Sequence, residues 1–166
     1  MSERSPAPGG LGLVQSLVNT LDVESGADSL DTAEGRARFG LAEEELPRAR
    51  ELRESLRVVL LAHAGHPPHR EVTPLGELLS AAPLLVRVDP EDGSAMLCAA
   101  DDTPLLSRVA AAVARSLVEG TWSRLKACEA ADCHWAYYDR SPAGRGRWCS
   151  MQVCGARAKM RRYRAK

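Results

Sequence analysis

The sequence predicts an α+β protein: a mostly helical N-terminal domain with one β-hairpin, then a small four-cysteine C-terminal module with a short hairpin and a basic helix. Three observations support this prediction. Apolar residues recur at helical spacing through most of the first 120 residues, a strand-like pattern appears there once, and four of the five cysteines lie after residue 127. We therefore expect one domain at residues 10–120 and a second at residues 121–166.

The first half of the N-terminal domain is expected to be helical. Helical spacing begins at Val14, and Thr32 or Asp31 is expected to cap a short second helix. The clearest helix covers residues 45–65, with Pro47 in its first turn. Apolar side chains follow one face of this helix, so we expect its arginines and glutamates on the opposite, solvent-facing side.

In the second half of this domain the spacing of apolar residues changes from a helical to a strand-like pattern and back. Residues 72–82 indicate a short helix with Thr73 as its cap. Residues 84–99 indicate two strands around a turn of Pro, Asp and Gly, hence a β-hairpin that buries the small Cys98 side chain. Another helix follows and ends or weakens at Gly120.

Charged and aromatic residues are distributed unequally on the two sides of residue 120. The formal net charge is zero, yet residues 121–166 hold 11 basic and 3 acidic residues, and residues 1–120 hold 11 basic and 19 acidic ones. Six of the seven aromatic residues with Phe, Trp or Tyr side chains lie after residue 120. This asymmetry indicates two structural units and a polyanion-binding segment in the second.

The four C-terminal cysteines form two pairs with equal spacing, Cys128-x4-Cys133 and Cys149-x4-Cys154. Two close pairs that a loop of fifteen residues separates are typical of a tetrahedral Zn²⁺ site. Two disulfides, four unrelated buried thiols and an iron–sulfur cluster are the alternatives. Four thiolates leave no ligand position open on zinc, so the site predicts a stable module without metal catalysis.

A basic helix is expected to start at Ser150 and to include the last cysteine in its first turn. Together with a loop after the predicted strand, it supplies a candidate nucleic-acid-binding surface. The candidate residues are Arg140, Arg145, Arg147, Arg157, Lys159, Arg161, Arg162 and Arg164. DNA is the predicted partner. A protein-interaction module with an acidic partner, RNA binding through Tyr137, Tyr138 or Trp148, and a plain solvated tail are the alternatives.

The C-terminal segment resembles the CGNR zinc finger, which commonly follows an ABATE domain. The resemblance rests on "YYDRS", "RWCSM" and "CGAR", and on the looser matches "LVNTLD" at residues 17–22 and "LRESLRVVLLA" at residues 52–62. It implies a bacterial transcriptional regulator with the four cysteines as zinc ligands and the finger as the DNA-binding element. Ala156 stands where the motif has Asn, which we expect to weaken contacts to DNA.

The remaining expectations concern the whole chain. No enzyme activity is expected, because the sequence has no Gly-rich phosphate loop and no nucleophile elbow. It lacks a secretory signal and a long apolar run, which predicts a cytoplasmic protein with no membrane partner. The N-terminal domain is expected to sense a small-molecule or protein signal or to mediate assembly, with a homodimer as one form. His63, His66 and His69 are expected to be polar residues of a helix end and the loop after it rather than metal ligands.

Overall fold

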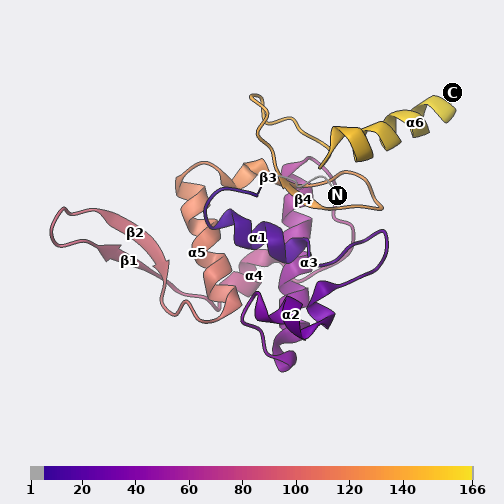
Figure 1. Cartoon of the computed structure of the whole chain (residues 1–166). Coiled ribbons are helices and arrows are strands. Elements are labelled where there is room, and N and C mark those ends of the chain that lie inside the picture. Colours follow the sequence, from indigo (N-terminus) through magenta and orange to yellow (C-terminus); the bar gives the residue numbers. More distant parts are fainter. Residues whose placement is uncertain (1–5, 166) are drawn as a thin grey trace.

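A computed structural model of the chain describes residues 6–165 and has the mixed α and β architecture that the sequence predicts (Figure 1). The helices are α1 (Leu11–Val18), α2 (Ala33–Ala37), α3 (Leu46–His63), α4 (Leu75–Leu79), α5 (Leu105–Val118) and α6 (Ala156–Arg164). The strands form two antiparallel hairpins, β1 (Leu84–Val88) with β2 (Ala95–Ala99), and β3 (Leu125–Ala127) with β4 (Ala136–Tyr138). Three short 3₁₀ helices are η1 (Ser29–Asp31), η2 (Glu43–Glu45) and η3 (Trp122–Arg124), and one π-helical segment is η4 (Met151–Gly155).

The main core lies where α1, α3 and α5 meet the hairpin β3–β4 (Figure 1). Leu56 and Leu60 of α3 have no exposed surface, and they belong to the same buried cluster as Leu125 of β3 and Ala136 of β4. The C-terminal hairpin thus packs into the core of the helices that precede it. The division of the chain at residue 120 stays a prediction, because a shared core does not define a boundary.

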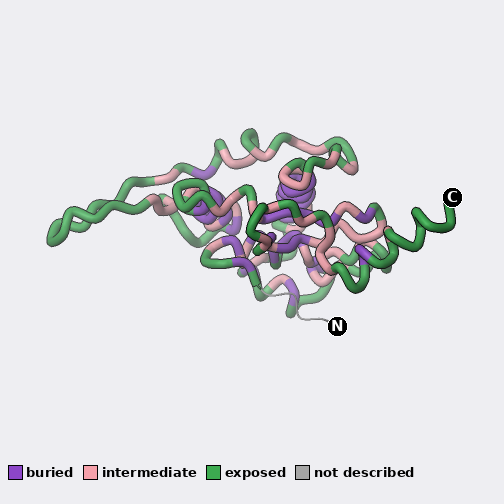
Figure 2. The backbone as a smooth tube through the Cα atoms, turned by 90° about the horizontal axis from the view of Figure 1, so that it is seen from above, coloured by how far each residue is buried: buried purple, intermediate pink, exposed green. Residues whose placement is uncertain are grey.

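Two elements extend away from this core at opposite sides of the molecule. The hairpin β1–β2 projects as an exposed arm, and α6 projects from the other side (Figures 1 and 2). Val86 and Val88 on the arm are 67% and 57% exposed. Helix α6 contains no buried residue. Both elements were predicted from the sequence, and neither contributes a buried residue to the core.

The prediction for the charged face of α3 is wrong in its central part. Arg53, Glu54 and Arg57 are buried, whereas we expected them to face solvent. The reason is an ion-pair network: Arg53 Nη1 lies 2.7 Å from Asp28 Oδ2, its Nε lies 2.8 Å from Glu54 Oε1, and Arg57 Nε lies 3.2 Å from Glu54 Oε2. Buried charges are tolerated when they are paired and hydrogen-bonded in this way.

Smaller differences concern helix starts and Cys98. Thr32 caps α2 as predicted, accepting a hydrogen bond of 3.0 Å from the amide of Gly35. Thr73 does not cap α4: its hydroxyl bonds the Glu51 carboxylate, and Pro74 occupies the position before the helix. Cys98 lies in β2 as expected but is only partly buried, because the arm has few neighbours.

Candidate metal centre

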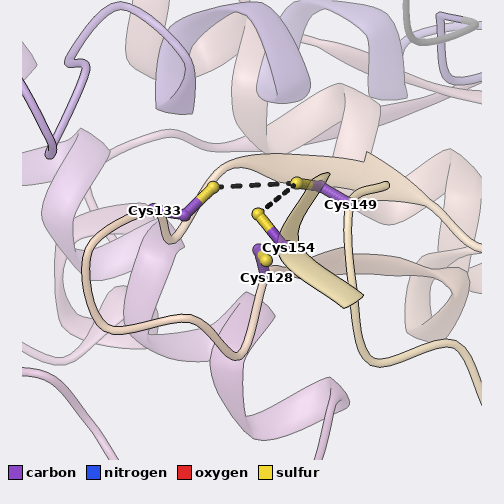
Figure 3. A group of neighbouring side chains, drawn as sticks. All are labelled: Cys128, Cys133, Cys149 and Cys154. Atoms are coloured by element: carbon purple, nitrogen blue, oxygen red, sulfur yellow. Dashed lines mark hydrogen bonds between the residues drawn. The ribbon is translucent and has the colours of Figure 1, made fainter. Parts of the chain in front are cut away.

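Four segments of the C-terminal region bring the four cysteine sulfurs together (Figure 3). Cys128 follows β3, Cys133 lies in the turn that leads to β4, Cys149 ends the long loop, and Cys154 lies in η4. All four Sγ atoms lie within 4.8 Å of one another. The structure therefore joins the two sequence pairs into one cluster, with Cys128 and Cys154 buried and the other two half-buried.

The sulfur spacing fits a metal ion and excludes a disulfide. The Sγ atoms of Cys133 and Cys149 are 3.7 Å apart, and those of Cys149 and Cys154 are 3.6 Å apart. Sulfur ligands about 2.3 Å from a tetrahedral ion lie roughly 3.8 Å from each other, whereas a disulfide bond measures about 2.05 Å. The four cysteines thus form a metal-binding cluster of the expected size.

The thiols of this cluster cannot all ionise without a cation between them. Hydrogen bonds from Cys133 and Cys149 lower the pKa of the Cys128 thiol. The hydrogen bond with Cys128 in turn raises the pKa of Cys133 and of Cys149, and burial raises the pKa of Cys154. A divalent ion would offset the repulsion and hold the sulfurs as thiolates.

The turn that carries Cys133 is bound directly to α3. His134 takes the left-handed backbone conformation, with φ of 47°, and its Nδ1 lies 3.1 Å from the carbonyl oxygen of Cys128. Arg57 donates from Nη1 to the carbonyl oxygen of His134 at 2.9 Å and from Nη2 to that of Val18 at 2.9 Å. One buried guanidinium therefore connects α1, α3 and the metal-binding turn.

Helix α1 holds the next segment, β4, through the amide side chain that ends it. Asn19 Nδ2 donates to the Ala136 carbonyl at 3.0 Å, and the Ala136 amide donates to Asn19 Oδ1 at 2.7 Å. The side chain thus replaces a neighbouring strand along the free edge of β4. Asn19 is not among the predicted site residues, although a polar residue at the end of an apolar helix favours capping or an internal hydrogen bond. Its position beside Thr20 at a helix end was the available signal, and Thr20 accepts from buried Arg53 at 3.1 Å.

The long loop between β4 and Cys149 is organised by Asp139. Its carboxylate accepts hydrogen bonds from Lys126 Nζ at 2.9 Å, from the Gly146 amide at 2.7 Å and from the Ser141 amide at 3.0 Å. Burial would raise the pKa of Asp139, but the hydrogen bonds from Lys126 and Ser141 hold it well below its usual range. A Cβ at Gly146 would lie 3.0 Å from this carboxylate, so a side chain there would press against a group that these hydrogen bonds hold in place.

All eight residues of the predicted nucleic-acid-binding set are exposed, but they differ in their contacts. Arg147 pairs with Glu129, Arg157 with Glu24 at 3.0 Å, and Arg161 with Asp132 at 3.7 Å. Arg140 donates to the carbonyl of Pro6 at 2.9 Å and lies over the Tyr138 ring. The other four make no ion pair within residues 6–165; they are Arg145, Lys159, Arg162 and Arg164.

The histidines and aromatic residues of the region have structural contacts. His63 Nδ1 lies 2.8 Å from the Leu125 carbonyl, His66 faces Glu129, and His69 Nε2 lies 2.9 Å from Glu54. They do not join a metal-binding group in the described part of the chain. Tyr137 is buried, and its hydroxyl donates to the Gly146 carbonyl at 2.7 Å. Trp148 packs against the cysteine cluster.

No helix in the described part of the chain is long and apolar enough to cross a membrane.

Comparisons with known proteins give the family. Residues 11–120 match the family model ABATE, which is described as "Putative stress-induced transcription regulator". Residues 124–166 match the CGNR zinc finger. No curated protein matches the chain. The first match covers well over half of the 166 residues, and the second covers the cysteine cluster and α6. The chain therefore belongs to the ABATE family and ends in a CGNR zinc finger.

Proposed function

We propose that this protein is a zinc-containing, DNA-binding transcription regulator of the bacterial cytoplasm, and that it has no enzyme activity. The observation that carries the proposal is that the cysteine cluster includes Cys154, which lies in η4 directly before α6. Helix α6 is exposed, carries five basic residues and projects from the core (Figure 1). The family description of the N-terminal part, a transcription regulator, agrees with this function. In this proposal the N-terminal domain receives a signal and the finger contacts DNA.

Zinc is the ion that suits the donor set best. Four thiolates at tetrahedral spacing bind zinc strongly, and a reduced cytoplasm keeps them available as ligands. Cys128, Cys133, Cys149 and Cys154 would hold the ion, which supplies a fixed cross-link between the turn at Cys133 and the start of α6. Because Cys154 lies in η4 and α6 follows directly, the cross-link sets the direction in which α6 leaves the core.

The charges around this helix support binding to a polyanion. Lys159, Arg162 and Arg164 of α6 are exposed and have no carboxylate partner in the part of the chain that the structure describes. Arg145, on the loop that Asp139 organises, is also exposed and has no carboxylate partner within residues 6–165. Such cations bind phosphates with release of counterions, so the affinity should fall steeply with salt.

Metal analysis and DNA titration test the proposal together. We expect one zinc ion per chain in gently purified protein, and fluorescence anisotropy should give tighter binding to duplex DNA than to single-stranded RNA. Genomic fragments selected on the protein should share a sequence. Arg162→Gln should weaken binding and lower the salt slope by about one. Arg48→Gln, an exposed arginine of α3, is the matched control and should bind like the unaltered protein.

The alternative function is a zinc-stabilised module that binds an acidic protein. The pairs Arg157–Glu24 and Arg161–Asp132 favour it, because they place carboxylates against one side of α6. This alternative predicts no useful affinity for duplex DNA at physiological salt. RNA binding by base stacking has less support, because Tyr137 is buried and Arg147 lies over the Trp148 ring.

A further inference from the structure

A pocket of about 450 Å³ lies between the arm β1–β2 and helix α5. Its lining includes the arginines Arg87, Arg108 and Arg115 and a single carboxylate, Asp102. This excess of positive charge stands out because residues 1–120 hold 19 acidic and only 11 basic residues. The volume falls within the range of small-molecule sites, roughly 300–1,000 Å³.

The arrangement of α5 produces this pocket. Arg108 and Arg115 lie seven residues apart on one face of the helix, and the small side chains of Ala111 and Ala112 lie between them. Leu13 of α1 adds an apolar surface beside them. The pocket therefore offers an apolar base with a cation at each end.

The hairpin closes the other side. In the β1–β2 register Arg87 stands opposite Met96, and Leu85 stands opposite Cys98, so these four side chains share one face of the arm. Arg87, Met96 and Cys98 line the pocket. The arm, otherwise a long exposed element, thus contributes a third cation to the site.

The three arginines lack acidic partners. None of them forms an ion pair with a carboxylate within residues 6–165. Arg108 donates to the Phe39 carbonyl, but its Nε is buried and has no hydrogen-bond partner in that part of the chain. Arg115 donates from Nε to the Ala111 carbonyl of its own helix at 3.4 Å. Guanidinium groups in this state attract carboxylates and phosphates, which they bind through paired charge-assisted hydrogen bonds.

We infer that this pocket binds a small organic anion, with a carboxylate or phosphate group held by the arginines and an apolar body over Ala111, Ala112 and Leu13. The inference deepens the proposed sensing role of the N-terminal domain, but it does not need the finger to bind DNA. The pocket also shares its walls with the elements that hold the finger. Helix α1 binds β4 through Asn19, and α5 continues through η3 into β3.

Isothermal titration of the full-length zinc-loaded protein tests the inference with three probes: benzoate, phenyl phosphate and neutral benzamide. We expect at least one of the two anions to bind saturably below roughly 10 mM, and we expect benzamide to bind at least tenfold more weakly. The two anions separate a carboxylate preference from a phosphate preference. Arg87→Gln and Arg115→Gln should each lower about tenfold the affinity for the anion that binds. Arg48→Gln on α3 should leave it unchanged.

A measurement on the unaltered protein makes the test independent of variant folding. Methyl resonances of Leu13, Ala111 and Ala112 should shift on adding the anion, whereas those of Leu52 in the core should not. No saturable anion binding, equal binding of benzamide, or shifts that avoid the pocket would each overturn the inference. Because no DNA is present, a failure of DNA binding would not affect this result.

Discussion

The two hairpins of this protein have opposite relations to its core. Strands β1 and β2 have five residues each, yet most of their side chains are exposed. Strands β3 and β4 have three residues each, and five of these six residues are buried. The longer hairpin is a projecting arm (Figure 2), and the shorter one belongs to the main core. The comparison teaches that contacts from other elements, rather than strand length, determine which hairpin is buried.

Metal removal should produce the largest difference in behaviour between the two hairpins. A structural zinc site contributes of the order of 10 kcal/mol of binding free energy. Chelation should therefore increase amide hydrogen exchange in β3–β4 and α6, while exchange in the exposed arm β1–β2, already fast, stays the same. Mass spectrometry of the two peptides before and after chelation gives the comparison within one sample. Equal changes in both hairpins, or no change in β3–β4, would contradict this account.

Loss of the Arg57 side chain should come next in size. Arg57 is completely buried and bonds Glu54, the Val18 carbonyl and the His134 carbonyl. Arg57→Met removes the donor to the Val18 and His134 carbonyls and leaves Glu54 with Arg53 and His69 alone, so it should lower the free energy of unfolding by about 3–5 kcal/mol. Arg87→Met on the exposed arm is the matched control and should cost less than about 0.5 kcal/mol. Urea denaturation measures both, and similar losses would remove the distinction between the hairpins.

Acid should weaken the same network. Burial opposes ionisation of Glu54, but hydrogen bonding to His69 and the charge of Arg57 lower its pKa to about 2 from 4.5. A depressed carboxyl pKa stabilises the fold at pH values above 4.5, and this contribution, about 3 kcal/mol, is lost as the pH falls from about 5 toward 2. Stability curves of the unaltered protein and Glu54→Gln should converge over this range. Parallel curves would contradict the assignment, since acid release of the metal affects both proteins alike.

The contact between α1 and β4 should have a smaller effect. Asn19→Ala removes the two hydrogen bonds that cover the edge of β4 and leaves the Ala136 amide without that partner. We expect a loss of about 2 kcal/mol in the free energy of unfolding. Ser16→Ala, an exposed position on the same helix, should change it by less than about 0.5 kcal/mol. If the two variants unfold alike, β4 is held by the metal and the core alone.

The sequence predicted those parts of the molecule that local patterns control. Apolar spacing was enough for the helix at residues 45–65, and the turn residues were enough for the arm. The symmetric spacing of the cysteines predicted their cluster, because two close pairs and a returning loop have few other uses. Capping chemistry was read correctly at Thr32 but not at Thr73, whose hydroxyl found a carboxylate on α3 instead.

What the sequence did not predict depends on contacts between distant segments. Arg53, Glu54 and Arg57 look like an ordinary solvated helix face until Asp28, Thr20 and His134 are placed around them. Asp139 gave only a weak signal, an acid followed two residues later by Ser141 as in an Asx turn. The pocket of three arginines gave none, because its members lie on β1 and α5 and no local pattern joins them.

The smallest effect should appear at an exposed position of the arm. Val86 is 67% exposed, so Val86→Thr removes little buried surface and suits a strand equally well. We expect a change in the free energy of unfolding within about 0.5 kcal/mol, against a loss of about 2–5 kcal/mol for Leu125→Ala in buried β3. Urea denaturation at two protein concentrations measures it. A loss above about 1 kcal/mol that grows with concentration would mean that a second copy covers the arm, since burial would then depend on association. The arm would then resemble β3–β4, with its stability coming from a partner chain instead of its own core.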